Sequence, residues 1–122
     1  MNKMIRKIWT VAVAMLAVGC AGEDSPAEVV EKCWDALSRG EVAKAVELMA
    51  VGENEKALYV EMFDKRSGAL QSTGGVEKLE VTGLYESAEE ATVEAIVRLK
   101  DGQEIEATYK LIKREGQWLI AE

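Results

Sequence analysis

The spacing of apolar residues changes at Gly74–Gly75, and that change constrains the fold more than any other feature of the sequence. Before the two glycines, apolar residues recur every three or four positions, as they do on one face of an α-helix. After them, apolar and polar residues alternate, as they do in β-strands with one buried face. The sequence therefore predicts an α+β fold of three helices followed by a four-stranded antiparallel sheet, with the helices on one face of the sheet.

The first predicted helix begins at Ser25, which can act as its N-cap. Pro26 suits the first helical position, and Glu28 completes a capping box with Ser25. Gly40 provides a left-handed residue at the other end. The apolar stripe of this helix comprises Val29, Val30, Cys33, Trp34 and Leu37.

Two further helices are predicted before the change of period. The second is short, ends at Gly52 and carries on one side Val42, Ala45, Val46 and Met49. The third covers roughly residues 54–66, and its apolar side comprises Leu58, Tyr59, Met62 and Phe63. Each spacing matches one face of a helix, so both helices are expected to pack through these side chains.

The turn at residues 100–102 determines how two strands pair. A two-residue loop would place the two apolar rows on opposite faces of the sheet. A three-residue loop with a left-handed glycine instead pairs Val97 with Ile105 and sets Arg98 across from Glu104. We therefore predict the three-residue loop.

At Glu115–Gly116 a two-residue loop is favoured, because it pairs Leu111 with Ile120 and brings Trp118 onto the same face. The first strand is expected to bury a row consisting of Leu79, Val81 and Tyr85. The predicted core consists of Trp34, Leu37, Phe63, Val97, Leu111, Trp118 and Ile120.

The N-terminus has the pattern of an export signal. Lys3, Arg6 and Lys7 precede an uncharged run, residues 8–19, and small residues lead to Cys20. As a helix this run is about 18 Å long, which is short for a membrane span. A secretion signal without lipid and a core helix of a cytosolic protein are the alternatives.

The series Leu16-Ala17-Val18-Gly19-Cys20 resembles the lipobox of bacterial lipoproteins. The resemblance implies cleavage before Cys20, acylation of Cys20, a tether over residues 20–24 and a domain over residues 25–122. Two or more acyl chains hold a protein durably at a membrane. The protein is therefore expected in a bacterial cell envelope, and the residues after Cys20 favour an outer membrane if the host is Gram-negative.

Two segments resemble the bacterial DUF4878 lipoproteins, which belong to the NTF2-like or cystatin-like superfamily. They are SPAEVVEKCWDALSRGEVAKAVELM and VRLKDGQEIEATYKLIKREGQWLI. The resemblance implies a cone in which helices pack into a curved sheet, with a pocket at its mouth. The side chains expected in this pocket or in the core beside it are Trp34, Tyr59, Phe63, Tyr85, Tyr109 and Trp118.

The chain contains no histidine, which removes histidine-dependent nucleophilic catalysis and imidazole metal sites. Cys33 lies on an apolar stripe and is expected to be a buried, inert thiol. The acidic runs lack the ligand spacing of a calcium loop. We predict no catalytic residue, no metal and no cofactor.

Charge limits the partners. Without residues 1–19, 12 basic and 22 acidic residues remain, a net charge of −10 against −7 for the whole chain. Such a surface disfavours nucleic acid. The expected partners are the membrane, through Cys20, and either a small apolar ligand or an envelope protein.

Three functions remain open. The favoured one is a non-catalytic binding module anchored in the envelope, and the second is a structural protein that acts through its acidic surface without a pocket. The third is an enzyme resembling ketosteroid isomerase, which would combine a tyrosine with Asp35 or Asp64. A weak homodimer through the second sheet face would involve Ile96, Ile112 and Leu119.

Overall fold

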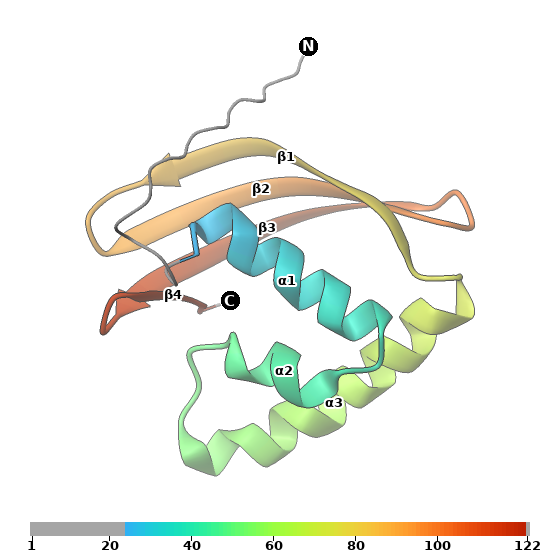
Figure 1. The fold of residues 1–122 in the computed structure, drawn as a ribbon, viewed down its shortest axis with the longest axis horizontal. Coiled ribbons are helices and arrows are strands. Elements are labelled where there is room, and N and C mark those ends of the chain that lie inside the picture. Colours follow the sequence, from blue (N-terminus) through green and yellow to red (C-terminus); the bar gives the residue numbers. More distant parts are fainter. Residues whose placement is uncertain (1–23, 122) are drawn as a thin grey trace.

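The computed structural model describes residues 24–121, in which three helices precede one antiparallel sheet (Figure 1). Cys20 and the predicted signal segment 1–19 lie outside the described residues. The strands follow each other in the sheet in chain order, β1-β2-β3-β4. This arrangement confirms the α+β prediction. The elements are α1 (Pro26–Ser38), α2 (Val42–Glu47), α3 (Glu53–Ser72), β1 (Val76–Glu86), β2 (Glu90–Leu99), β3 (Glu104–Arg114) and β4 (Gln117–Ile120).

Helix α1 begins as its sequence predicts. The Ser25 hydroxyl accepts a hydrogen bond from the Glu28 backbone N–H at 3.2 Å, and the Glu28 carboxylate accepts one from the Ser25 N–H at 2.8 Å. Pro26 occupies the first helical position. Gly40 follows the helix with a φ of 77°, a conformation that glycine adopts without steric cost. The capping box and the glycine therefore confirm the predicted bounds of α1.

Helix α3 is longer than the sequence predicted. The expected segment, 54–66, was wrong at its C-terminal end, because the helix continues to Ser72. Ser67 and Leu70 are buried one and two turns beyond Phe63, so the buried stripe carries on. The Ser67 hydroxyl donates a 2.7 Å hydrogen bond to a backbone carbonyl of α1, which satisfies this polar group inside the protein.

Both predicted turns are confirmed. Val97 lies opposite Ile105, and Arg98 lies opposite Glu104 with 2.6 Å between guanidinium and carboxylate. Gly102 has a φ of 98°, as the three-residue loop requires. The two-residue turn pairs β3 with β4 through Leu111–Ile120, Ile112–Leu119, Lys113–Trp118 and Arg114–Gln117.

In strand β1 the predicted inward position of Tyr85 is wrong. A register shift at Thr82 adds a residue to β1 and exchanges the faces of all residues that follow it. Leu84 therefore lies opposite Val93 on the inner face, whereas Tyr85 lies opposite Thr92 on the outer face. Tyr85 is 63% exposed and belongs neither to the core nor to a pocket.

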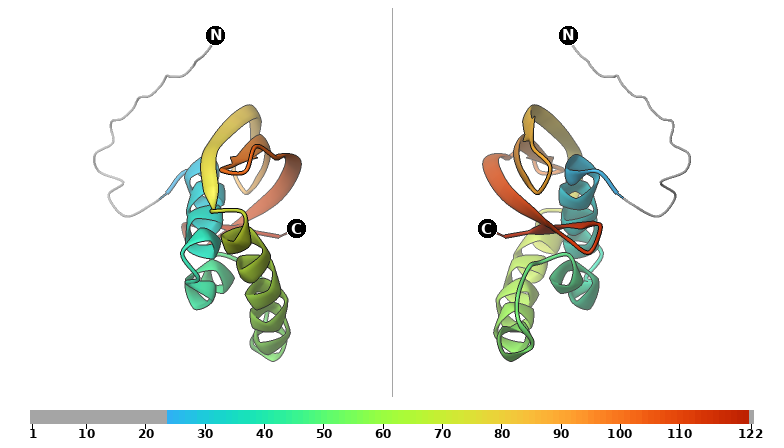
Figure 2. Two further views of the ribbon diagram at one scale, coloured as in Figure 1. Left: turned by 90° about the vertical axis from the view of Figure 1, so that its right-hand side faces the viewer. Right: turned by 90° about the vertical axis from the view of Figure 1, so that its left-hand side faces the viewer.

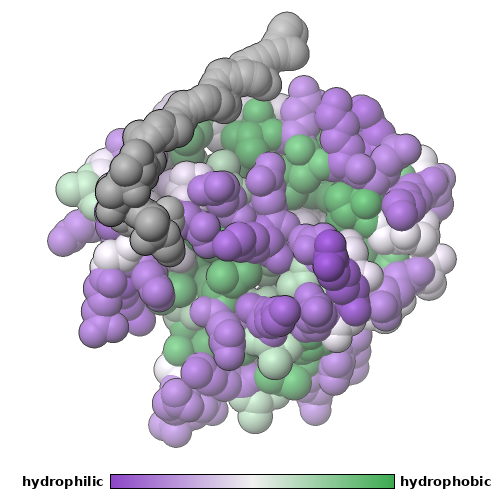
Figure 3. Space-filling view, viewed as in Figure 1, coloured by the Kyte–Doolittle hydropathy of each residue, from purple (hydrophilic) through white to green (hydrophobic). Residues whose placement is uncertain are grey.

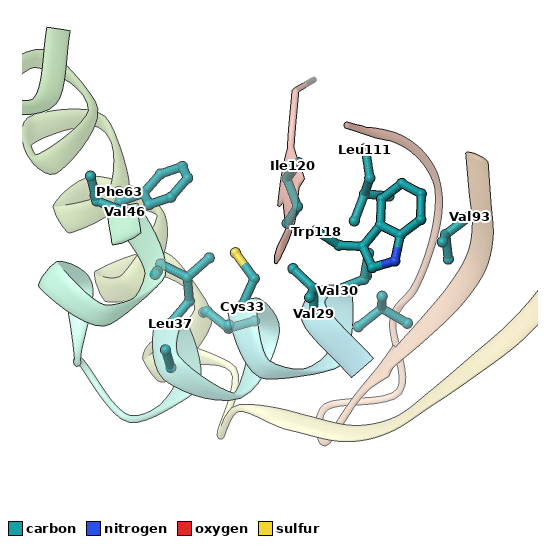
Figure 4. Close-up of a cluster of buried hydrophobic side chains, with 14 of the residues drawn as sticks. Val29, Val30, Cys33, Leu37, Val46, Phe63, Val93, Leu111, Trp118 and Ile120 are labelled. Atoms are coloured by element: carbon teal, nitrogen blue, oxygen red, sulfur yellow. The ribbon is translucent and has the colours of Figure 1, made fainter. Parts of the chain in front are cut away.

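One contiguous core lies between α1 and the sheet and extends to α2 and α3 (Figure 4). The side chain of Trp118 is 4% exposed and packs in this core. Of the predicted core residues, Trp34 alone is only half-buried, and it packs against the cluster from its edge. The remaining six predicted core residues are confirmed as buried members of the cluster: Leu37, Phe63, Val97, Leu111, Trp118 and Ile120.

Helix α1, rather than α3, covers the sheet. Helix α1 contacts β1, β2 and β4, whereas α3 contacts α1 and α2 and extends away from the strands (Figure 2). Leu58 and Met62 were predicted to pack, but they are 58% and 37% exposed. The prediction was wrong because the period of a helix marks an apolar face without showing that a partner covers all of it.

The outer sheet face separates the three residues expected to seed a homodimer. Ile112 and Leu119 lie opposite each other on β3 and β4. Ile96 lies between Glu80 on β1 and Glu106 on β3. The homodimer remains a prediction, with Ile112 and Leu119 as its apolar pair.

Among the described residues 24–121, the hydrophobic core extends along the chain from Val29 to Ile120. Hydrophobic residues that remain visible on the face in Figure 3 form separate patches among hydrophilic ones. We therefore expect residues 24–121 to fold as an independent domain. Within it, no helix combines the length and the apolar character that crossing a membrane requires.

Candidate functional site

A cavity of about 450 Å³ lies between α1, α3 and the end of the sheet where β2 turns into β3. Small-molecule sites in proteins are usually clefts of roughly 300–1,000 Å³ with mostly apolar walls. The cavity forms because α3 diverges from the strands while α1 remains packed on them. Its lining residues are Cys33, Trp34, Leu37, Met49, Phe63, Arg66, Ala69, Leu70, Thr73, Leu99, Gln103, Ile105, Tyr109 and Ile120.

The cavity has an apolar floor and a more polar mouth. Buried side chains form the floor, and these are Cys33, Leu37, Phe63, Leu70, Leu99 and Ile120. Three lining residues are exposed and therefore mark the mouth: Arg66, Ala69 and Gln103. A ligand that enters here moves from solvent past polar side chains into an apolar interior.

A tryptophan and a tyrosine form a polar contact on the wall. The Trp34 indole N–H donates a 2.8 Å hydrogen bond to the Tyr109 hydroxyl, joining α1 to β3. Burial raises the pKa of Tyr109, so the hydroxyl stays protonated at neutral pH. Among residues 24–121 no acceptor is found for the hydroxyl proton of Tyr109. The wall can therefore donate one hydrogen bond to a ligand.

Arg66 is the one ionised side chain in the cavity lining of the described chain. Its guanidinium carbon lies 5.7 Å from the centre of the Phe63 ring, within the range of a cation–π contact. The positive charge of Arg66 also acts on two other lining groups, because it lowers the pKa of both Cys33 and Tyr109 against the stronger effect of burial. Arg66 therefore places one positive charge at the mouth.

Cys33 is a buried thiol on the floor. Burial raises its pKa from 9.0 to about 11, although the charge of Arg66 acts in the opposite direction. The thiolate is the nucleophilic form of cysteine, and it is scarce at neutral pH when the pKa is this high. The geometry gives Cys33 a packing role.

The structure brings together half of the side chains expected in a pocket. Trp34, Phe63 and Tyr109 line the cavity. Tyr59 packs edge-on against Phe63, with ring centroids 6.1 Å apart, and lies outside the lining. Trp118 belongs to the core, and Tyr85 lies on the outer face, as described above.

Sequence reasoning missed Arg66 and Gln103. Arg66 lies at the end of the predicted third helix, so its alignment with Phe63 and Leu70 was not recognised. One signal was present: the positions three and four residues away on either side of Arg66 are occupied by Met62, Phe63, Ala69 and Leu70. Residues three and four positions apart are neighbours on one face of a helix, so this spacing placed the charge of Arg66 within an apolar stripe.

The carboxylates proposed for an isomerase lie elsewhere. Asp35 pairs with Arg39 on the exposed side of α1, at 3.1 Å. Asp64 is exposed on α3 and is absent from the lining. Within the described chain, no Asp or Glu lines the cavity, and no group of three or more metal-ligating side chains forms.

Comparisons with known proteins identify relatives of this sequence and this fold. The family model DUF4878, described as a domain of unknown function, matches residues 18–121. Among curated proteins no match was found.

Several solved structures have a similar fold. A Campylobacter jejuni protein that carries the name NTF2-like transpeptidase is 14% identical, with a TM-score of 0.68, over 81% of this chain and 99% of its own. A SEC-C motif containing protein from Rhodopseudomonas palustris is 21% identical, with a TM-score of 0.62, over 80% and 76%. A de novo designed NTF2 fold protein has a TM-score of 0.53 at 12% identity, over 83% of this chain and 87% of its own.

Proposed function

The chain belongs to the DUF4878 family, a domain of unknown function, and has an NTF2-like fold; from this premise we propose that it is a non-catalytic binding module anchored in a bacterial envelope. Its site is the cavity between α1, α3 and the sheet, and its ligand is a small apolar molecule. The fold alone does not decide this, because one fold hosts many functions. The observation that carries the proposal is the open cavity with a buried apolar floor.

Burial of a ligand on this floor gives a favourable free energy. Each Å² of apolar surface removed from water contributes about 25 cal/mol. Six floor residues and the half-buried Ile105 offer aliphatic, aromatic or thiol contacts, while the Trp34–Tyr109 pair supplies one hydrogen-bond donor. This combination of apolar walls and few polar groups is typical of sites that bind small molecules.

The geometry gives less support to nucleophilic catalysis. Transpeptidation, which the name of the Campylobacter protein specifies, needs an activated nucleophile. Cys33 is buried, and its pKa of about 11 keeps it protonated. No histidine is present in the sequence to activate it. We therefore assign the cavity to binding.

The anchor part of the proposal rests on the sequence. The basic residues, the uncharged run and the lipobox-like series end at Cys20, a few residues before α1 begins at Pro26. Acyl chains on Cys20 would keep the cavity close to a membrane surface. A site held there meets apolar molecules that leave or enter the bilayer.

A neutral apolar dye tests the cavity. We expect N-phenyl-1-naphthylamine to bind the domain 24–121 and to fluoresce more strongly when bound. The variant Ala69→Phe places a ring at the mouth of the cavity and should weaken dye binding. Ala57→Phe makes the same change on an exposed position of α3 outside the lining and should leave binding unchanged. Equal binding by wild type and Ala69→Phe would contradict the proposal.

A further inference from the structure

We propose that the cavity binds a single-chain amphiphile with a carboxylate headgroup, with the carboxylate at Arg66 and the chain on the apolar floor. The inference rests on the proposed function, because it specifies the ligand class of the same cavity. Three observations support it. Arg66 lies at the mouth, the lining changes from polar at the mouth to apolar at the floor, and the other lining side chains carry no charge.

Arg66 has the position that a headgroup contact requires. It is exposed, whereas Phe63 before it and Leu70 after it on the same stripe are buried in the cavity. The guanidinium is thus accessible to water at the mouth, one helical turn from the floor. A carboxylate can meet it there without losing all its hydration, while the attached chain enters the apolar interior.

Arg66 has no carboxylate partner within the described protein. Arg39 and Arg98 form ion pairs with Asp35 and Glu104, but no ion pair within 4.0 Å involves Arg66. The residues on its own stripe are apolar, as noted above, so helix neighbours cannot neutralise it. Its one described contact is the Phe63 ring. A ligand carboxylate can therefore bind it without displacing an internal partner.

A carboxylate matches the site better than other headgroups. A guanidinium binds a carboxylate with two parallel hydrogen bonds. A single cation balances the one charge of a carboxylate, whereas a phosphate monoester carries nearly two charges at neutral pH. An ammonium headgroup would be repelled by Arg66. The Tyr109 hydroxyl, whose proton has no described acceptor, adds a donor on the wall that an oxygen ligand could use.

The acidic surface favours binding of an anionic amphiphile at this cavity over binding elsewhere on the protein. The described chain is rich in Asp and Glu, so a fatty anion is repelled over most of its surface. The mouth of the cavity is an exception, because its lining contains one cation and no carboxylate. An amphiphilic anion is thus directed to one place.

The test uses four ligands that share one alkyl chain and differ in headgroup: laurate, dodecanol, dodecylammonium and dodecyl phosphate. Each is titrated below its micelle-forming concentration against the dye-loaded domain 24–121, and dye displacement gives its affinity. We expect laurate to bind more tightly than the other three. Arg66→Gln should weaken laurate binding by about tenfold and leave dodecanol unchanged.

The matched control is Lys65→Gln. Lys65 is the adjacent residue on α3, is exposed and lies outside the cavity lining, so it should not change laurate binding. A general effect of positive charge would weaken laurate equally in both variants and would overturn the proposal. Far-UV circular dichroism of both variants checks that α3 is intact.

The outcomes separate this inference from the proposed function. If the dye binds in the cavity but laurate and dodecanol compete equally, or Arg66→Gln has no effect on laurate, the headgroup assignment is wrong and the apolar site stands. Tighter binding of dodecyl phosphate or dodecylammonium would likewise contradict the carboxylate. If neither dye nor any of the four ligands binds wild type, both proposals fail.

Discussion

The indole N–H of Trp34 donates a 2.8 Å hydrogen bond to the hydroxyl of Tyr109, joining the first helix to the third strand across 75 positions of the sequence. The bond fixes one wall of the cavity, because both side chains line it and each comes from a different layer of the fold. It also gives the half-buried indole N–H an acceptor and leaves the Tyr109 hydroxyl proton available to a ligand.

The bond predicts a measurable coupling. Tyr109→Phe and Trp34→Phe each remove one partner, and a partly buried hydrogen bond of this kind contributes about 1 kcal/mol. Urea unfolding of the wild-type domain 24–121, both single variants and the double variant gives a double-mutant cycle. We expect an interaction energy of about 0.5–1.5 kcal/mol. A value indistinguishable from zero would mean that the two groups do not bond in solution.

Trp118 should be a major source of stability. Its side chain is 4% exposed in the core, so Trp118→Ala should reduce the free energy of unfolding by about 3–5 kcal/mol. Leu119→Ala is a truncation on the outer face of the same strand. It should reduce the free energy of unfolding by a smaller amount, because Leu119 is only half-buried. Urea denaturation measures both. A loss below about 1 kcal/mol for Trp118→Ala would refute the assignment of faces.

Two glycines should respond to alanine with opposite signs. A Cβ added at Gly102 or at Gly68 meets no atom within 4 Å, so packing does not distinguish them. Gly102 has a φ of 98°, and alanine there should destabilise the domain by about 1–2 kcal/mol. Gly68 is in the interior of α3, where alanine should stabilise by about 0.5–1 kcal/mol. Thermal unfolding of both variants measures the two changes. Melting temperatures that shift in the same direction would contradict the turn geometry.

Cys33 should react slowly in the folded protein. With a pKa of about 11, against 9.0 ordinarily, its ionised fraction near neutral pH falls about a hundredfold. Labelling by a disulfide reagent should thus be at least about a hundredfold slower than in urea-unfolded protein. Rapid labelling of the native domain would show that the thiol is accessible and ionised.

The same pKa predicts a change of stability with pH. The folded state holds the Cys33 proton more strongly than the unfolded state, so the free energy of unfolding falls as pH rises from 9.0 towards 11. Other groups also titrate in this range. The comparison is therefore between wild type and Cys33→Val, which should lose less stability over these pH values. Parallel curves for the two proteins would contradict the burial of the thiol.

The proposed anchor is tested in cells. Full-length protein expressed in its native host should start at Cys20, carry acyl chains there and sediment with membranes. Cys20→Ser should release it from the membrane fraction. Intact-mass spectrometry identifies the N-terminus, and an unmodified terminus at another residue would refute the anchor.

Much of the fold could be predicted because local rules and burial agreed. At residues 100–102 only one loop length keeps both apolar rows on the same face, and the observed pairing of Val97 with Ile105 follows from it. The capping box at Ser25 was equally predictable, because its two hydrogen bonds join residues only three positions apart. Features of this kind are determined by neighbours in sequence.

The remaining features depend on tertiary contacts. The predicted third helix ended near residue 66, but the helix continues to Ser72, and the hydrogen bond from Ser67 to the Leu37 carbonyl stabilises this continuation. The register shift between Val81 and Gly83 reverses the face of Tyr85, and its local signal, a glycine inside the strand, was not used. The cavity itself was least predictable, because a helical period shows which side of α3 is apolar but not that α3 leaves the sheet.

The most direct test of the cavity is a nuclear magnetic resonance titration of the two indole N–H groups in the domain 24–121. Trp34 lines the cavity and Trp118 is buried in the core outside it, so one spectrum contains both a reporter and its control. We expect laurate to shift the Trp34 indole resonance saturably while that of Trp118 changes little. If the Trp34 resonance stays fixed at saturating laurate, or both resonances shift equally, the cavity is not the binding site.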